Sequence, residues 1–117
     1  MDIQAAMKEL LSLDGAMATA VVDSNSGMVL GKEGTGIDLD LAGAGNTEVV
    51  KAKMRTMESL GLNDQIEDIL ISLGSQYHII RPSSKKKGLF LYYVVSKRGN
   101  LALARHKAAE VEQALTI

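Results

Sequence analysis

The chain has 117 residues, a formal net charge of −1 and no cysteine. The absence of cysteine excludes disulfides, thiol nucleophiles and thiolate metal sites, and this length predicts one domain over residues 1–117. The near-neutral charge argues against a nucleic-acid partner, and no apolar run reaches the roughly 20 residues that a membrane-spanning helix needs, so we expect no membrane insertion. The N-terminus lacks the basic start and apolar block of a secretory signal, so we expect a cytoplasmic protein.

The first part of the chain predicts a helix followed by a β-hairpin. Asp14-Gly15 ends the helix, and the apolar run 16–22 indicates a strand that is covered on both faces. The polar turn 23–27 then leads into a second strand at 28–33. We interpret the hairpin as scaffold. The helix itself is indicated by apolar residues at helical spacing, namely Ile3, Met7, Leu10 and Leu11.

The longest predicted element is a central helix that runs to Leu60. Either Asp38 or Asp40 can cap its N-terminus. At its other end, Leu60-Gly61-Leu62 has the composition of a glycine C-cap followed by an apolar contact residue. A helix from Asp40 to Leu60 is about 30 Å long at 1.5 Å per residue.

This central helix has two features that point to a partner. Gly43 and Gly45 each cost a helix interior roughly 1 kcal/mol relative to alanine, so either another backbone packs closely there or the first turn is loosely wound. Further along, Val50, Met54 and Met57 share one stripe. A second face of small or amphipathic side chains, which we interpret as a surface for a protein partner, comprises Val49, Ala52, Lys53 and Thr56.

Three strands and a helix complete the chain. Residues 65–73 predict a strand whose polar start suits a sheet edge, and Gly74-Ser75 has the glycine-first pattern of a type II′ turn. The next strand, 76–81, is then antiparallel and ends at Pro82. The order α-β-β-α-β-β-β-α predicts an α+β fold with one five-stranded, mostly antiparallel sheet and helices on both faces. The last elements are a solvated basic loop at 83–87, a strand at 88–96 and a helix capped by Asn100.

No residues form a recognised catalytic or metal-binding motif. His78 and His106 are the only histidines, whereas catalytic zinc normally needs three protein ligands. Ser24 lacks the G-x-S-x-G context of a hydrolase nucleophile, and the glycine-rich loop 31–36 lacks the pattern of a phosphate-binding loop. We therefore predict no enzyme activity, no catalytic residue, no metal and no cofactor. A small hydrolase would need distant residues to converge.

An ordered set of segments runs along the chain: 13–15 before 20–23, then 27–30, the long helix, 69–71, 78–80 and 100–105. This set resembles the roadblock family, which includes dynein light chains and bacterial regulators of small Ras-like GTPases. The resemblance spans essentially all 117 residues. It implies a roadblock/profilin-like sheet with the central helix on one face and the terminal helices on the other. It also implies a homodimer that joins edge strands and sets two central helices side by side.

We therefore expect a non-enzymatic, homodimeric regulator or adaptor that binds a small Ras-like GTPase, to activate or to localise it. The alternative is a structural dimeric scaffold without a nucleotide-linked partner. Arg55 and Arg105 are candidates for an arginine finger, but we interpret both as surface salt-bridge residues. The residues predicted at the dimer or partner interface are Gly43, Asn46, Val50, Lys53, Met54, Met57, Glu67 and Ile69.

Overall fold

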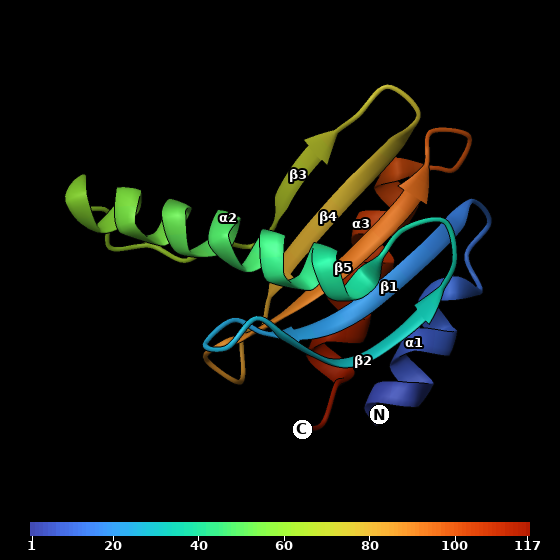
Figure 1. Cartoon of the computed structure of the whole chain (residues 1–117), viewed down its shortest axis with the longest axis horizontal. Helices are drawn as coiled ribbons and strands as arrows, with labels where there is room; N and C mark the ends of the chain where they lie inside the picture. The colour runs from blue at the N-terminus through green and yellow to red at the C-terminus, as the bar shows by residue number, and fades with distance from the viewer.

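The computed structural model describes residues 1–117 and contains three helices and a five-stranded sheet (Figure 1). The strand order is β2-β1-β5-β4-β3, and every neighbouring pair is antiparallel. The predicted α+β fold and the predicted order of elements are confirmed. The elements are α1 (Ile3–Leu11), β1 (Ala16–Asp23), β2 (Met28–Gly34), α2 (Leu39–Ser59), β3 (Ile69–Ser72), β4 (Gln76–Pro82), β5 (Leu89–Ser96) and α3 (Leu101–Ala114).

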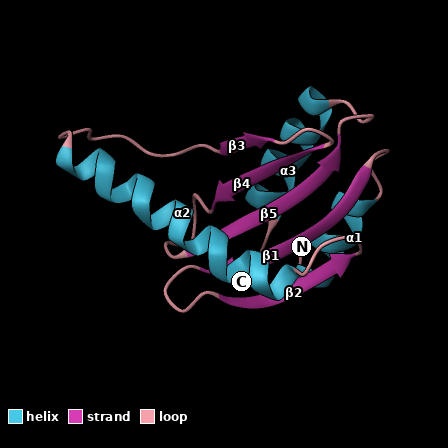
Figure 2. Ribbon diagram, turned by 45° about the horizontal axis from the view of Figure 1, so that its top comes forward, coloured by secondary structure: helices cyan, strands magenta, loops and turns pink.

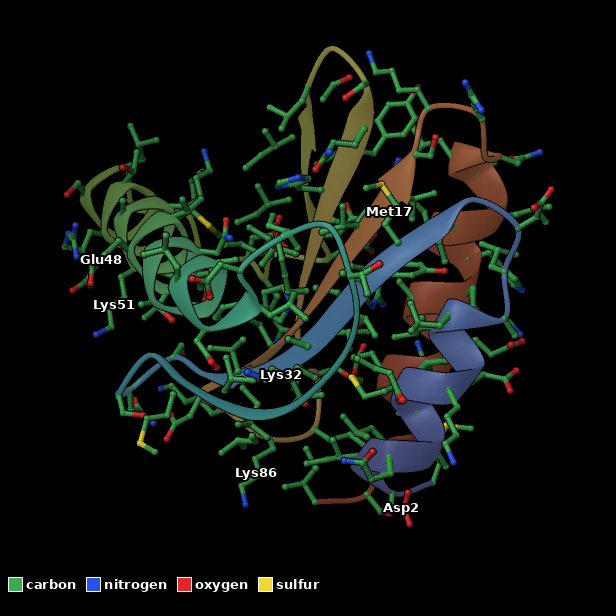
Figure 3. All side chains as sticks on the ribbon, turned by 45° about the vertical axis from the view of Figure 1, so that its right-hand side comes forward. Asp2, Met17, Lys32, Glu48, Lys51 and Lys86 are labelled. Carbon is green, nitrogen blue, oxygen red and sulfur yellow. The ribbon has the colours of Figure 1, made fainter.

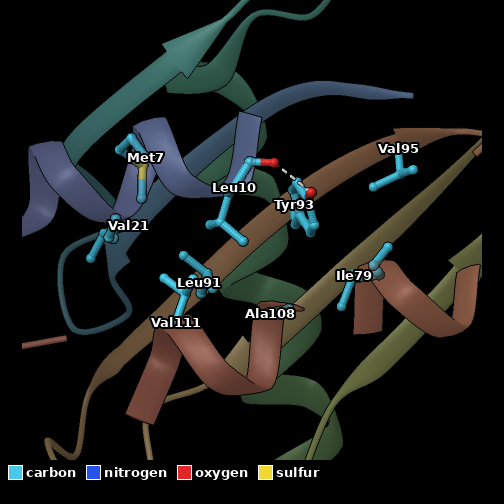
Figure 4. Packing of buried hydrophobic residues seen from close by; sticks show 11 residues of the cluster. Met7, Leu10, Val21, Ile79, Leu91, Tyr93, Val95, Ala108 and Val111 are labelled. Atoms are coloured by element: carbon cyan, nitrogen blue, oxygen red, sulfur yellow. Dashed lines mark hydrogen bonds between the residues drawn. The ribbon is translucent and has the colours of Figure 1, made fainter. Parts of the chain in front are cut away.

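Helices cover both faces of the sheet (Figure 2). Helices α1 and α3 lie on one face and α2 crosses the other, and an apolar cluster fills each layer. The central strands β1 and β5 therefore contribute to both clusters, which explains why their sequences are almost continuously apolar. In the layer under α1 and α3, the buried Tyr93 hydroxyl donates to the Leu10 carbonyl at 2.6 Å (Figure 4). Burial raises the pKa of Tyr93 to about 12, so this donor keeps its proton.

Both predicted caps of the central helix are present. Asp38, rather than Asp40, is the N-cap, and its carboxylate accepts a hydrogen bond from the Leu41 N–H at 3.1 Å. Gly61 follows the helix with a φ of +68°. The Leu62 N–H donates to the Met57 carbonyl and the Gly61 N–H to the Glu58 carbonyl, which is the Schellman pattern.

Two predictions in the second half of the chain are wrong. β3 begins at Ile69, not at Gln65, because residues 65–68 have no strand partner. The Gln65 N–H instead donates to the Asp64 side chain. Gly74 does not have a positive φ, so the turn is not type II′. This turn closes through one bond from the Leu73 N–H to the Gln76 carbonyl and needs no left-handed residue.

Gly43 sets the distance between α2 and the sheet. A Cβ atom at this position would lie 2.7 Å from Cγ2 of Val29 and 3.4 Å from Cγ2 of Val22. A Cβ at Gly45 would meet no atom within 4 Å. Of the two alternatives that the sequence leaves open, the structure therefore shows close packing at Gly43, and the neighbouring strands belong to the same chain.

A buried ion pair joins α3 to the sheet. The Glu112 carboxylate is only 2% exposed and accepts from Arg81 Nε at 3.0 Å. The Ser84 N–H and hydroxyl donate to its second oxygen at 3.1 and 2.8 Å. Burial alone would raise the pKa of Glu112, but the bonds from Ser84 and the Arg81 charge outweigh it and hold the pKa below its usual value.

Replacing Glu112 is expected to destabilise the fold in a pH-dependent way. Glu112→Ala should lower the free energy of unfolding by about 3 kcal/mol near neutral pH, because Arg81 and Ser84 lose their buried partner. The folded carboxyl has a depressed pKa, so its contribution is complete above the unfolded pKa and is lost as the pH falls below about 4.5. Urea titrations of both proteins should show the difference shrinking in acid; a pH-independent difference would contradict the ion pair.

The two glycines of α2 should respond in opposite ways to larger side chains. Gly45→Ala should raise the free energy of unfolding by about 1 kcal/mol, because alanine is the better helix former and the site is open. Gly43→Leu should lower it by about 2 kcal/mol through overpacking against β1 and β2. Thermal unfolding in dilute solution measures both. Equal effects at the two sites would refute the close contact at Gly43.

Candidate protein-interaction surface

Helix α2 extends beyond the part of the sheet that it covers (Figures 1 and 2). Its buried residues are Leu39, Gly43, Thr47 and Val50, and no residue of the helix after Val50 is buried. Met54 continues the same inward stripe and is nevertheless 48% exposed. The second half of the helix thus presents apolar side chains that the chain itself leaves uncovered.

A seam of small side chains runs along one flank of α2. Burial raises the pKa of Tyr92 on β5, and the side chain of Asn46 beside this seam opposes that rise, so this flank of α2 faces the β5–β4–β3 side of the sheet. The opposite flank lies on the β1–β2 turn, where a Cβ atom added at Gly27 would lie 3.5 Å from the Cα atom of Ala44. Spacings of three and four residues alternate along the seam, as in the contact line of packed helices. Its members are Ala42, Gly45, Val49, Ala52 and Thr56.

The two edge strands of the sheet differ in how they are protected. β2 has a register shift opposite Val21 and Val22, and its edge includes Gly31 and Lys32. Bulges and lysines of this kind discourage pairing with another strand. β3 pairs with β4 in an unbroken register and contains no lysine, proline or bulge. The β3 edge, which lies on the same side of the sheet as the seam, is therefore the better template for strand addition.

Beneath α2, His78 belongs to a polar chain that links β4 and β5. Its Nδ1 lies 2.9 Å from the Tyr92 hydroxyl and its Nε2 lies 2.5 Å from Gln76 Oε1. Burial lowers the pKa of His78, which favours the neutral ring, with Nε2–H donating to Gln76 and Nδ1 accepting from Tyr92. The interpretation of His78 as a histidine on a sheet face is thus confirmed.

The other residues considered for chemistry, Ser24 and His106, do not share hydrogen-bond partners with His78. The Ser24 hydroxyl donates to the Gly88 carbonyl, and His106 is exposed on α3 beside Glu110. No group of three or more metal-ligating side chains gathers in the chain. No helix is both long and apolar enough to cross a membrane.

The structure divides the predicted interface residues into two groups. Gly43 and Val50 are buried against the chain's own sheet, so the chain itself covers them. Asn46 is half-buried and bonds to the Ala42 carbonyl. The exposed or half-exposed remainder lies on the second half of α2, the connector to β3 and β3 itself, and comprises Lys53, Met54, Met57, Glu67 and Ile69.

Several exposed apolar residues of this surface were not predicted. Leu60 is the C-cap of α2, Leu62 lies two residues beyond it, and Leu70 lies on β3. The apolar pattern of the sequence does not distinguish residues that the sheet covers from residues that lie beyond its edge. The sequence therefore gives no signal that these three leucines are exposed.

The predicted salt bridge of Arg105 is confirmed, since its guanidinium bonds to both carboxylate oxygens of Asp68. The same prediction for Arg55 is wrong, because Arg55 forms no salt bridge within the chain. The basic loop is solvated as expected, with Lys86 and Lys87 exposed. Lys85 bonds to the Gln113 carbonyl near the end of α3.

Solved structures share this arrangement although their sequences differ widely. A roadblock/LC7 domain from Streptomyces avermitilis superposes with a TM-score of 0.84 at 14% identity, covering 97% of this chain and 94% of that one. MglB from Myxococcus xanthus gives 0.81 at 16% identity over 93% and 87% of the two chains. A gliding protein MglB from Thermus thermophilus gives 0.73 at 15% identity over 95% and 88%.

Sequence comparison adds no relative: no family model matches the chain, and no curated protein matches it significantly. The agreement with the solved structures nevertheless covers nearly the whole chain and nearly the whole domain of the Streptomyces protein. This chain therefore has the roadblock/LC7 fold.

Proposed function

We propose that this protein is a homodimeric regulator or adaptor that binds a small Ras-like GTPase. The observation that carries the proposal is the exposed second half of α2 beside an unprotected β3 edge, on a roadblock fold. An apolar stripe that leaves its own sheet needs a second surface to cover it. A second copy of the chain offers a matching helix and a matching edge.

In the proposed dimer the two β3 strands pair antiparallel across a two-fold axis. Such an interface is isologous, so the same residues contribute from each copy. The small seam of each α2 then allows the two helices to pack closely. Lys53 and Glu67 have opposite charges and no ion-pair partner within the chain, which suits a contact between copies. One solved structure is described as MglB with a tetrameric arrangement, which supports self-association in this fold.

The GTPase would bind the outer side of the paired helices. Figure 3 shows Glu48 and Lys51 on the side of α2 that faces away from the sheet. Arg55 continues this polar side one turn later and is exposed. The choice of a Ras-like GTPase rests on the resemblance to the roadblock family. A regulator of this kind acts by favouring one arrangement of the switch loops of the GTPase.

Met54→Asp tests the dimer. We expect the dimer dissociation constant to rise about a hundredfold or more, because an unpaired carboxylate within an apolar interface costs several kcal/mol. Sedimentation equilibrium measures the constant. Leu103→Asp is the matched control, since Leu103 is 53% exposed on α3 and lies outside the proposed interface. A wild-type chain that stays monomeric at all concentrations contradicts the homodimer.

A charge reversal on the outer side of α2 tests the GTPase proposal. The probe is the purified Ras-like GTPase encoded nearest to this chain's gene, loaded with GDP or with a non-hydrolysable GTP analogue. We expect calorimetry to show binding that depends on the nucleotide and that falls at least tenfold in Glu48→Lys/Lys51→Glu, while the dimer persists.

Lys86→Glu is the control for this reversal, since Lys86 lies on the β4–β5 loop away from α2 (Figure 3). Binding should be unchanged in this variant. No association in either nucleotide state would contradict the regulator and favour a structural dimeric scaffold.

A further inference from the structure

The connector between α2 and β3 is held to the rest of the chain at few points. Leu62 closes the end of the helix through its bond to Met57, and the Gln65 N–H bonds only to its neighbour Asp64. The next side-chain tie is at Asp68, the residue immediately before β3. Besides the four residue pairs with β4 and the packing of Ile69 and Ile71 against the core, the position of the β3 edge therefore depends on how Asp68 is fixed.

Asp68 is fixed by Arg105 of α3, on the face of the sheet opposite α2. Arg105 Nε donates to Asp68 Oδ2 and Nη2 donates to Oδ1, both at 2.8 Å. This two-bond fork gives a defined orientation as well as attraction, which a single lysine contact would not. The Asp68 side chain is only 11% exposed, so the pair is partly shielded from solvent on the carboxylate side.

We propose that Arg105 is a positioning residue that holds β3 in the register needed for pairing with a second copy of the chain. The inference rests on the proposed homodimer and deepens it by assigning a role to α3. Arg105 does not itself lie in the interface; it acts through Asp68. This Arg105–Asp68 pair, the clamp, thereby couples α3 on one face of the sheet to the β3 edge that the partner uses.

The coupling has a simple thermodynamic basis. β3 contributes only four residue pairs with β4 and has no strand on its other side, so it belongs to the least stable part of the sheet. Self-association needs β3 paired with β4 in both copies. The apparent dissociation constant of the dimer therefore rises as the inverse square of the fraction of molecules in which β3 is in place. If loss of the clamp leaves β3 in place in about a third of the molecules, the constant rises about tenfold.

Arg105→Ala tests this role. Sedimentation equilibrium should show a dimer dissociation constant raised at least tenfold, with circular dichroism unchanged. Hydrogen exchange of the Ile69–Ser72 amides in dilute protein should accelerate, which a merely electrostatic effect on the dimer would not produce. Lys107→Ala is the matched control, because Lys107 forms a comparable pair on α3 at 2.7 Å but binds Glu9 of α1. It should leave both readouts unchanged.

The reversed pair Arg105→Asp/Asp68→Arg should recover most of the lost self-association, because it restores the fork with the partners exchanged. Dimerisation of the wild type together with an unchanged constant in Arg105→Ala overturns the clamp and leaves the homodimer standing. A wild type that does not self-associate overturns the homodimer and the clamp together. If the reversed pair recovers no self-association, Arg105 does not act through Asp68, and the proposal is overturned.

Discussion

Helix α2 is longer than the part of the sheet that it covers, and this constraint leaves the second half of the helix uncovered by the chain itself. The helix is anchored at its start, where Asp38 caps it and Gly43 lets it lie close to β1 and β2. Its last buried residue is Val50, yet it continues to Ser59, about 14 Å further at 1.5 Å per residue. An exposed helix segment of this length gains little from propensity alone, and we propose that packing from outside the chain stabilises it.

The two edges of the sheet differ in how readily they can pair with another strand. The bulged β2 edge, with Lys32 on it, is poorly suited to further pairing, whereas the regular β3 edge is open. The open edge and the small seam of α2 lie on the same side of the molecule. A single two-fold partner can therefore satisfy both, and the outer polar side of α2 stays free for another protein.

Much of this fold can be predicted from local sequence rules. The candidate interaction surface on α2 can be predicted from the sequence only in part. The helix ends follow from local interactions, namely the caps at Asp38, Gly61 and Asn100. The two central strands, β1 and β5, follow from their apolar runs. The start of β3 is mispredicted because residues 65–68 have the composition of an edge strand but no partner strand.

The surface on α2 depends on tertiary geometry. Met54 and Val50 have the same place in the helical period, and only the position of the sheet edge makes one exposed and the other buried. Likewise, Gly43 is a signal of close packing in the sequence, but the sequence does not say that the neighbour is the chain's own sheet. The pairing of Arg105 with Asp68 joins residues far apart in the chain and follows from the fold alone.

The proposed homodimer requires that a second copy of the chain covers the second half of α2. Amide hydrogen exchange of residues 51–59, measured across a range of protein concentrations, tests it most directly. If a second copy covers this segment, its protection should increase with concentration while that of the buried strands β1 and β5 stays constant. Protection of residues 51–59 that does not change with concentration would contradict the claim.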